Sequence, residues 1–566
     1  MNFERLVQRT AATLLMSMIC LISLAQSRTV SGVVLDSRGD PVIGANIRVV
    51  SDASIGTITD LDGKFSLAVP GTAKQLEISF IGMQTQTVSI VAGQPVHVTL
   101  AEDAEILDEV VVIGYQTVKR KDLTGSVASV SGEQIAAMPV ANAAQALQGK
   151  LAGVNVTTQD GRPDAAVSIR VRGGISITQS NDPLYIIDGF PSEDGMSTID
   201  PAEIETIDVL KDASATAIYG ARGANGVVVI TTKNGSKSSG KATVNFDAYW
   251  GAKTLAKKLD VLSPYEFIKL DYERTLWRIG NGDTSSDGME AWKKRYGEYS
   301  DLESNYISRK GIDWQEETLG RTALTQNYRI SVSGKTDKMN YSLAYSYYDE
   351  EGAMVYSSNK KHNISFNINH AVSNWLTINS RISYDQMRIE GMGTSENTDR
   401  FNKMQHIIQY RPTIGIQGAD ADLLFGEDPI LADDSGNVMQ NPLISAAEEI
   451  NNREWRTFQA NGGATIKLWK GFSFRSTVGM RYQTRRNDIF YGADSQTAKR
   501  SSIYGSITNI ESSSLQNSNV LSYSWKNSSH DVAIMVGHEF VTKWTRQFSA
   551  GATQFPNDEI GLADLS

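Results

Sequence analysis

Alternation of apolar and polar residues over the C-terminal half of the chain constrains its fold more than any other feature. A period of two residues is that of a β-strand, and about ten residues is the length of a tilted strand that crosses a bilayer. One segment sets Tyr328, Ile330 and Val332 against Asn327, Arg329 and Ser331. Strands of this kind are predicted near residues 242–252, 325–334, 338–348, 362–370, 375–386, 456–468, 471–483, 516–525 and 530–541.

The connections between these strands alternate in length. Long connections are predicted at 253–324, 349–361, 387–455 and 484–515, and the others are short, such as "KTD" and "WK". A soluble β-sandwich shows the same side-chain alternation, but tight turns at one end and long loops at the other are typical of a membrane barrel. Because single-chain bacterial barrels close with an even number of strands, nine strands predict only part of a barrel. The sequence ends at "FPNDEIGLADLS", inside a predicted outer loop, so we expect a truncated protein in which residues 239–566 form the first strands of a transmembrane antiparallel β-barrel.

The N-terminus has the pattern of a secretory signal peptide. Arg5 and Arg9 precede the apolar run "AATLLMSMICLISLA", and cleavage is predicted after Ala25. Cys20 is the only cysteine and lies inside this run, so the mature chain has no thiol for a disulfide, a zinc site or nucleophilic attack. Lipidation of Cys20 is an alternative, although Ile19 is bulky for the residue that precedes a lipid-modified cysteine.

Composition excludes several classes of function. The chain has 566 residues, too many for one ordinary domain, and a formal net charge of −10, which argues against nucleic acid as a partner. Beyond the signal peptide no segment approaches the ~18 apolar residues of a membrane helix, which leaves an exported soluble protein or a β-barrel. The six histidines show no H-E-x-x-H spacing, and no G-x-S-x-G motif occurs. We therefore expect no enzyme, no catalytic residue, no metal site and no cofactor.

Two segments precede the α/β region. Residues 28–101 contain short strands separated by Gly, Pro and Asp turns, which predicts a small β-sandwich. Residues 102–121 form a linker in which an acidic approach leads into the apolar run Val110, Val111, Val112 and Ile113. This short run is either an ordinary sheet strand or an edge offered to another protein for strand addition.

Residues 122–238 predict a mixed α/β unit that ends in "DASATAIYGARGANGVVVITTKNG", with three regularly spaced glycines: Gly220, Gly223 and Gly226. Phosphate-binding loops run from strand to glycine turn to helix, because the anion binds at a helix N-terminus. Here the order is reversed, with a helix expected at 213–219 and a buried strand at 227–232. The glycines therefore predict a sharp turn from helix to strand rather than a nucleotide site.

Several stretches resemble the SusC-like group of TonB-dependent outer-membrane transporters. The junction "LDEVVVIGYQTVKRKDLTGSVASV", the segments "LQGKLAGVNV", "VSIRVRG" and "DPLYIIDG", and the glycine stretch together resemble the plug domain of that group and the linker before it. The β-unit at 28–101 resembles its carboxypeptidase-regulatory-like domain. The resemblance is specific over about residues 29 to 240, whereas the barrel region matches only in pattern. Gln116 departs from it, since the group usually has glycine there.

The resemblance implies active import of a large nutrient, an oligosaccharide or a peptide, across the outer membrane of a Gram-negative bacterium. It implies that TonB of the inner-membrane energy-transducing complex pairs with a contact strand before the plug, and that a SusD-like surface lipoprotein covers the barrel. The contact strand comprises Glu109, Val110, Val111, Val112, Ile113, Gly114 and Tyr115. No substrate-contacting residue is assigned, and an exported β-domain adhesin or binding protein without transport is the alternative.

Three arginines are candidates to hold the plug. Arg170, Arg172 and Arg222 are expected to pair with acidic groups on the lumen wall, and a solvated surface role is the alternative. In the long outer connections Trp277, Trp292 and Trp314 either stack on sugar rings or, as we favour, pack local cores.

Overall fold

The structure is a computed structural model in which the chain forms two compact units, with their boundary in the linker. The predicted signal peptide and the linker residues Glu109, Gly114 and Tyr115 lie outside the described residues. The structure describes residues 27–36, 39–50, 52–80, 83, 85–91, 93–101, 110–113, 116–119, 127–138, 140, 142–158, 161–163, 165, 167–174, 176–178, 180–192, 195–212, 216–238, 240–282, 288–391, 403–416, 418–424, 439–527, 530–555 and 561–562.

The N-terminal unit is the predicted β-sandwich. One sheet has the order β4-β1-β7 and the other β3-β2-β5-β6. Strand β4 has strict alternation of exposed and buried residues, and its inward side chains join those of β1, β2, β5 and β7 in one apolar core. The strands are β1 (Ser27–Asp36), β2 (Asn46–Val49), β3 (Asp52–Ile58), β4 (Lys64–Pro70), β5 (Gln75–Ser79), β6 (Gln86–Ser89) and β7 (Val96–Leu100).

A two-stranded ribbon follows in the linker. It consists of β8 (Val110–Ile113) and β9 (Gln116–Lys119), which pair with each other and with no other described strand. The apolar run predicted as a contact strand is therefore extended, as expected. Among the described strands, none pairs with the outer edge of β8 or of β9.

The α/β unit is built on a five-stranded sheet of order β10-β15-β16-β13-β14, with a separate β11-β12 pair. Its core contains Ile135, Leu147 and Ile169 beside the strands β15 and β16, each of which contributes apolar side chains to two buried clusters. Its elements are β10 (Val127–Ser131), α3 (Gly132–Ala136), η2 (Gln145–Leu147), β11 (Val154–Thr158), β12 (Val167–Val171), β13 (Leu184–Ile187), β14 (Phe190–Ser192), η3 (Pro201–Glu203), β15 (Ile204–Leu210), η4 (Ala217–Gly223) and β16 (Val227–Thr232).

The glycine stretch forms a tight turn into β16, but the helix before it differs from the prediction. It is the 3-10 helix η4, which begins at Ala217 and runs past Gly220, where the backbone takes φ 59° and ψ −146°. The helix expected at 213–219 is confirmed over 217–219, as a 3-10 helix, but it continues to Gly223 instead of ending at Tyr219, because glycine tolerates the non-helical conformation at position 220. Gly226 has φ 92°, and a Cβ there would lie 2.9 Å from Cβ of Val171, so this position needs glycine for conformation and for space.

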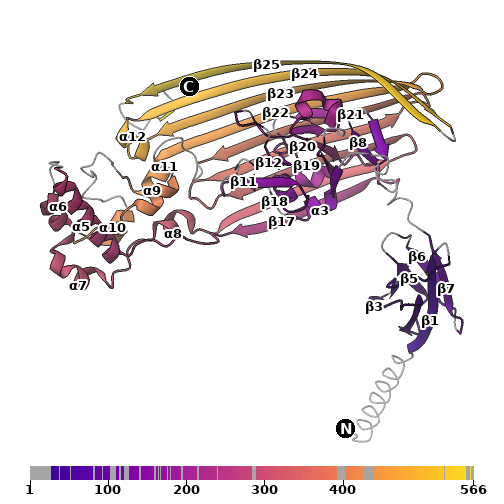
Figure 1. Cartoon of the computed structure of the whole chain (residues 1–566), viewed down its shortest axis with the longest axis horizontal. Coiled ribbons are helices and arrows are strands. Elements are labelled where there is room, and N and C mark those ends of the chain that lie inside the picture. The colour runs from indigo at the N-terminus through magenta and orange to yellow at the C-terminus, as the bar shows by residue number, and fades with distance from the viewer. Residues whose placement is uncertain are drawn as a thin grey trace, which may run out of the picture. The chain divides into compact units, whose positions relative to one another are not determined.

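The C-terminal half is one curved sheet of nine strands in chain order, all antiparallel, which we call the strand wall (Figure 1). Each strand coincides with a predicted one, and most extend further at the long-loop end. The strands are β17 (Thr243–Lys253), β18 (Ala323–Lys335), β19 (Met339–Glu351), β20 (Ser358–Ala371), β21 (Leu376–Glu390), β22 (Glu449–Lys467), β23 (Phe472–Tyr491), β24 (Tyr504–Lys526) and β25 (Asp531–Thr553).

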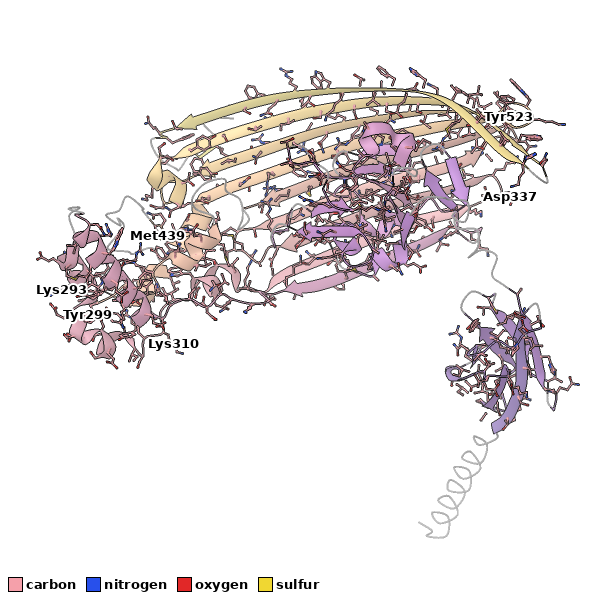
Figure 2. The ribbon with its side chains drawn as sticks, viewed as in Figure 1. Lys293, Tyr299, Lys310, Asp337, Met439 and Tyr523 are labelled. Atoms are coloured by element: carbon pink, nitrogen blue, oxygen red, sulfur yellow. The ribbon has the colours of Figure 1, made fainter. Side chains whose placement is uncertain are left out.

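Helices occupy the long connections, at the end of the strand wall opposite the short turns. In Figure 2, Tyr299 and Met439 mark the long-connection end, whereas Asp337 and Tyr523 mark the short-turn end. Trp292 and Trp314 are buried in separate helical cores, as favoured from the sequence, and Trp277 is 70% exposed. The helices are α5 (Pro264–Gly280), α6 (Gly288–Tyr296), η5 (Tyr299–Asp301), α7 (Leu302–Tyr306), α8 (Trp314–Leu319), α9 (Lys403–Gln409), α10 (Asp420–Leu424), α11 (Pro442–Glu448) and α12 (Gln496–Arg500).

No helix in the part of the chain that the structure describes has the length and apolar character needed to cross a membrane.

The exposed face of the strand wall is apolar and its buried face is polar, which is the reverse of a sheet in a soluble protein. Apolar and aromatic side chains are exposed on one face, among them Ile330, Leu343, Ile364, Ile382, Val478 and Met480. Polar side chains are buried on the other, among them Ser331, Ser342, Asn363, Ser365, Asn367, Ser383, Asn461 and Gln483. A sheet with an apolar outer face and a polar inner face is that of a membrane barrel, because lipid rather than water contacts the outer face.

Candidate functional site

The α/β unit lies against the polar face of the strand wall, where β20 provides a continuous row of contacts (Figure 1). Every second residue of β20 points at this unit, since side chains on one face of a strand recur at every second position. Most of these contacts are hydrogen bonds to backbone carbonyl oxygens of the α/β unit. They therefore depend on the course of its backbone rather than on the identity of its side chains. Asn359, Lys361, Asn363 and Asn367 donate to the carbonyl oxygens of Pro163, Ser197, Thr198 and Lys233, at 3.4, 2.5, 3.2 and 3.2 Å respectively.

A buried charge cluster strengthens this contact. Arg381 of β21 donates to Oδ2 of Asp188 at 3.1 Å and to Oε2 of Glu203 at 3.4 Å. Ser365 donates to the other oxygen of Glu203 at 2.7 Å. Arg381 is 6% exposed and Glu203 is 3% exposed, so the two charges are shielded from water. Burial raises the pKa of Glu203, and the positive charge of Arg381 opposes that rise.

Local sequence explains the position of Asp188. The pair Asp188 and Gly189 joins β13 to β14, and both residues have positive φ, at 49° and 88°. Two successive positive φ values are those of a type I′ hairpin turn, for which Asp-Gly is a preferred sequence. The carboxylate of Asp188 also accepts hydrogen bonds from the backbone N–H and the hydroxyl of Thr232, at 2.9 and 2.7 Å. The turn thus fixes an acidic group at the surface that meets the strand wall.

Steric fit accompanies the polar contacts. Phe190 begins β14 and is buried against Gly479 of β23. A Cβ at Gly479 would lie 2.5 Å from Cδ1 of Phe190, closer than any real side chain allows. The glycine therefore makes room in the wall for one aromatic ring of the α/β unit.

The predicted anchors do not take part in this cluster. Arg170, Arg172 and Arg222 are exposed, and within the described part of the chain none of them forms an ion pair with the strand wall. Their anchoring role stays a prediction. The observed pairs have the opposite arrangement, with carboxylates on the α/β unit and the arginine on the wall. Sequence reasoning did not find Asp188, Glu203 or Arg381.

A cavity of about 760 Å³ opens between the α/β unit and the strand wall, towards the long-connection ends of the strands. The α/β unit contributes Arg162, Asp182, Tyr185 and Arg222 to its lining, and the wall contributes Tyr348, Lys361, Met387, Arg453, Trp455 and Arg485.

The outer face of the strand wall changes character along each strand. On β23 the outward residues from Phe472 to Tyr482 are mostly apolar, and ten residues at ~3.3 Å each span ~33 Å along the strand. A tilt of about 40° leaves ~25 Å across the bilayer, the height of a typical apolar band. Tyr384, Phe458 and Tyr482 lie side by side on β21, β22 and β23, and form an aromatic row at the end of this band.

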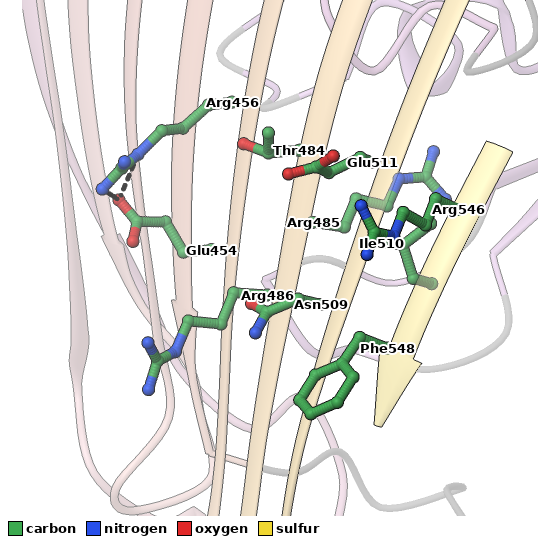
Figure 3. Close-up of a pocket in the computed structure, with 10 residues that line it drawn as sticks. All are labelled: Glu454, Arg456, Thr484, Arg485, Arg486, Asn509, Ile510, Glu511, Arg546 and Phe548. Atoms are coloured by element: carbon green, nitrogen blue, oxygen red, sulfur yellow. Dashed lines mark hydrogen bonds and ion pairs between the residues drawn. The ribbon is translucent and has the colours of Figure 1, made fainter. Parts of the chain in front are cut away.

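Charged residues replace the apolar band immediately beyond the aromatic row. Figure 3 shows Arg456, Arg486 and Arg546 with Glu454 and Glu511 on adjacent strands, around a cavity of about 550 Å³. The ion pair of Arg456 with Glu454, at 2.7 Å, is drawn there. Such a change from aromatic to charged side chains is expected where a membrane surface meets water.

Comparisons with known proteins agree with this architecture. Residues 119–227 match a family model described as the TonB-dependent Receptor Plug Domain, and residues 30–112 match one described as a CarboxypepD_reg-like domain. TonB-dependent receptor P3 of Formosa agariphila is 30% identical over 553 residues, which are 96% of this chain and 50% of the relative. TonB-dependent receptor SusC of Bacteroides thetaiotaomicron is 39% identical over 357 residues, which are 61% of this chain and 32% of the relative.

Among solved structures, the RagAB peptide importer in its open-open state superposes with a TM-score of 0.65 and 26% identity, covering 81% of this chain and 51% of the importer chain. The chain thus spans about half the length of the P3 receptor and of this importer chain.

Proposed function

Because the chain is related to the SusC-like TonB-dependent receptors through its plug, the β-domain before it and its strand wall, we propose that the full-length protein imports a large nutrient, an oligosaccharide or a peptide, across the outer membrane of a Gram-negative bacterium. The observation that carries this proposal is the seating of the α/β unit, hereafter the plug, on the polar face of a sheet whose other face is apolar. A plug held in this way closes a pore. An adhesin or soluble binding module needs neither an apolar outer face nor a plug.

Energy for import is proposed to come from TonB through strand addition to β8. Outer membranes have no ATP, so work on the plug must be transmitted mechanically from elsewhere. Strand β8 is short and apolar, and β9 occupies only one of its edges. The other edge offers backbone N–H and C=O groups for a partner strand. Several backbone hydrogen bonds loaded together resist shear better than isolated side-chain contacts.

Proline at position 112 tests this proposal. Val112→Pro removes a backbone donor and disfavours the strand, so we expect uptake of the cargo to be abolished while the barrel still inserts and keeps heat-modifiable migration. Val112→Thr is the matched control, since threonine is also β-branched and keeps the N–H group. We expect it to import at the wild-type rate. Undiminished import by the proline variant would exclude β8 as the contact strand.

A SusD-like surface lipoprotein is proposed as the partner of the long outer connections. Large apolar side chains are exposed on this helical region, among them Trp277 at 70%, Ile307 at 60% and Ile416 at 54%. Exposed apolar side chains of this size are typical of a protein-binding surface. Replacing Trp277 with aspartate is expected to reduce recovery of the lipoprotein with the full-length receptor, and equal recovery would place the contact elsewhere.

A further inference from the structure

The short turns of the strand wall lie next to one another at one end of the sheet, where Figure 2 labels Asp337 and Tyr523. We call them the turn rim, and its described residues are 336–338, 372–375, 468–471, 527 and 530. Each of the first three turns is tied by a backbone hydrogen bond to the strand end beside it, so the rim is one continuous surface. The N–H groups of Ala371, Lys467 and Ser524 donate to the carbonyl oxygens of Lys338, Trp375 and Gly471, at 2.7, 2.8 and 2.8 Å respectively.

Aromatic side chains join the turn rim to the apolar band of the strand wall. Trp375, Trp469 and Trp525 lie in or beside three of the turns and are 56%, 67% and 45% exposed. The ring of Trp469 packs on Phe472 with centroids 5.1 Å apart, and Phe472 packs on Tyr523 at 4.5 Å. Because Phe472 is also where the apolar band of β23 begins, the rim continues the surface that faces lipid. Tryptophan is enriched where the hydrocarbon of a membrane meets its headgroups.

The turn rim has the depth of the lipid headgroups. A turn of four residues, such as 468–471, extends about two residues beyond the strand ends, which at ~3.3 Å each and a tilt of about 40° is ~5 Å along the membrane normal. The headgroup layer on each side of the hydrocarbon is about 5–8 Å thick. With the apolar band in the hydrocarbon, the side chains of the rim therefore lie at the level of the lipid phosphates.

Two lysines of the turn rim are available to a ligand. Lys338 and Lys470 are exposed, and within the described residues neither forms an ion pair or a side-chain hydrogen bond, not even Lys338 with the neighbouring Asp337. The opposite edge of the apolar band differs, because three arginines beyond the aromatic row each pair with a carboxylate on their own strand. These pairs are Arg388 with Glu390, Arg456 with Glu454 and Arg486 with Asp488, at 3.0, 2.7 and 2.8 Å.

We propose that the turn rim binds anionic phospholipid in the inner leaflet of the outer membrane, with Lys338 and Lys470 on the phosphates and Trp469 among the upper acyl chains. An ammonium group binds phosphate as a point charge. A zwitterionic lipid has the same phosphate but brings its own cation, which competes with the lysines. Charge complementarity and continuity with the apolar band both favour lipid over a soluble partner. This inference rests on the proposed membrane location and adds a lipid preference to it.

The lipid retained by the full-length protein tests the inference. The protein is inserted into vesicles of equal parts phosphatidylglycerol and phosphatidylcholine and extracted in mild detergent, and its bound lipids are counted by native mass spectrometry. We expect phosphatidylglycerol to be enriched roughly fivefold or more, since each lysine near an anionic surface contributes about that factor, and the enrichment to fall as salt rises. Equal retention of the two lipids would overturn the proposal. Equal retention together with binding of soluble hexaglutamate would assign the rim to a soluble acidic partner instead.

Lysine variants at the two edges of the apolar band locate the preference. Lys338→Gln combined with Lys470→Gln is expected to remove most of the enrichment, whereas Lys338→Arg combined with Lys470→Arg should retain it. Lys360→Gln is the matched control, because Lys360 lies on the outer face of β20 beyond the aromatic row, 4.0 Å from Asp349, and should keep the wild-type preference. An unchanged preference in the double glutamine variant would refute the assignment of the site.

Heat-modifiable migration shows whether each variant inserts, and the salt dependence of the wild type needs no variant at all. Failure of the wild type to insert would count against the proposed function. Insertion without a lipid preference would count against this inference alone.

Discussion

Removing the wall arginine that holds the plug should loosen the plug more than any single change elsewhere in the wall. Arg381→Met leaves Asp188 and Glu203 facing each other without their shared cation, at a position where Arg381 was 6% exposed. Removing one partner of a buried ion pair costs about 3–5 kcal/mol, because the remaining charge is left in a poorly solvated place. At about 1.4 kcal/mol per factor of ten, the equilibrium constant for plug release should rise by roughly a hundredfold to a few thousandfold.

Under the proposed function a displaced plug opens the pore, so conductance of the reconstituted full-length protein in a planar bilayer measures this release. We expect Arg381→Met to conduct at a clearly lower urea concentration than the wild type. Arg388→Met, on the outer face of the same strand β21, is the control and should shift the onset little, because Arg388 forms an exposed pair with Glu390. Adding Glu203→Gln to Arg381→Met should recover much of the loss. If Arg381→Met behaved like Arg388→Met, the cluster would not hold the plug.

Three further outcomes are expected. Gly226→Ala should destabilise the plug by about 2–5 kcal/mol from backbone strain and the contact with Val171 combined, whereas Gly173→Ala in the same unit, with a similar φ of 99° and no atom within 4 Å, should show the strain alone; denaturant unfolding of the plug measures both. Val478→Arg should destabilise the barrel in lipid by about 2–4 kcal/mol, and Thr484→Arg, on the same face beyond the aromatic row, by about 0–1 kcal/mol, as urea unfolding in vesicles would show. Burial raises the pKa of Glu203 above its ordinary 4.5, so Glu203 binds a proton more tightly in the seated plug than in the released plug. Seating should therefore be strongest below pH 4.5 and should weaken as the pH rises through the raised pKa. Glu203→Gln should flatten the dependence of conductance onset on pH.

The positions of the wall strands were predictable, and their full lengths were not. Inside the bilayer each strand must present apolar residues to lipid at every second position, which is the pattern that the sequence displays. Beyond the aromatic row both faces of a strand meet water or protein, so the pattern disappears while the hydrogen-bonded ladder continues. Strand β24 illustrates this, since it begins at Tyr504 rather than near residue 516, through the polar run "IESSSLQN".

The plug contacts were less predictable than the strands. In the sequence, Asn363, Ser365 and Asn367 alternate with apolar residues and so share one face of a strand, but that face is exposed in a soluble sheet and turned inward in a membrane barrel. Charged residues in the plug offered no better guide, because their partners come from a strand almost two hundred residues away, as with Asp188 and Arg381. The exposed arginines were the more conspicuous candidates in sequence, whereas the pairing acids lie in a hairpin turn and a short 3-10 helix.

Strand β20 connects the seat of the plug with the cavity beside it. Asn363 and Ser365 hold Thr198 and Glu203 of the plug, and two residues further out Lys361 both lines the cavity and donates to the carbonyl of Ser197. Lys361 and Arg381 both act electrostatically on Asp385 of β21, so their contributions to holding the plug share a partner and are expected to be non-additive.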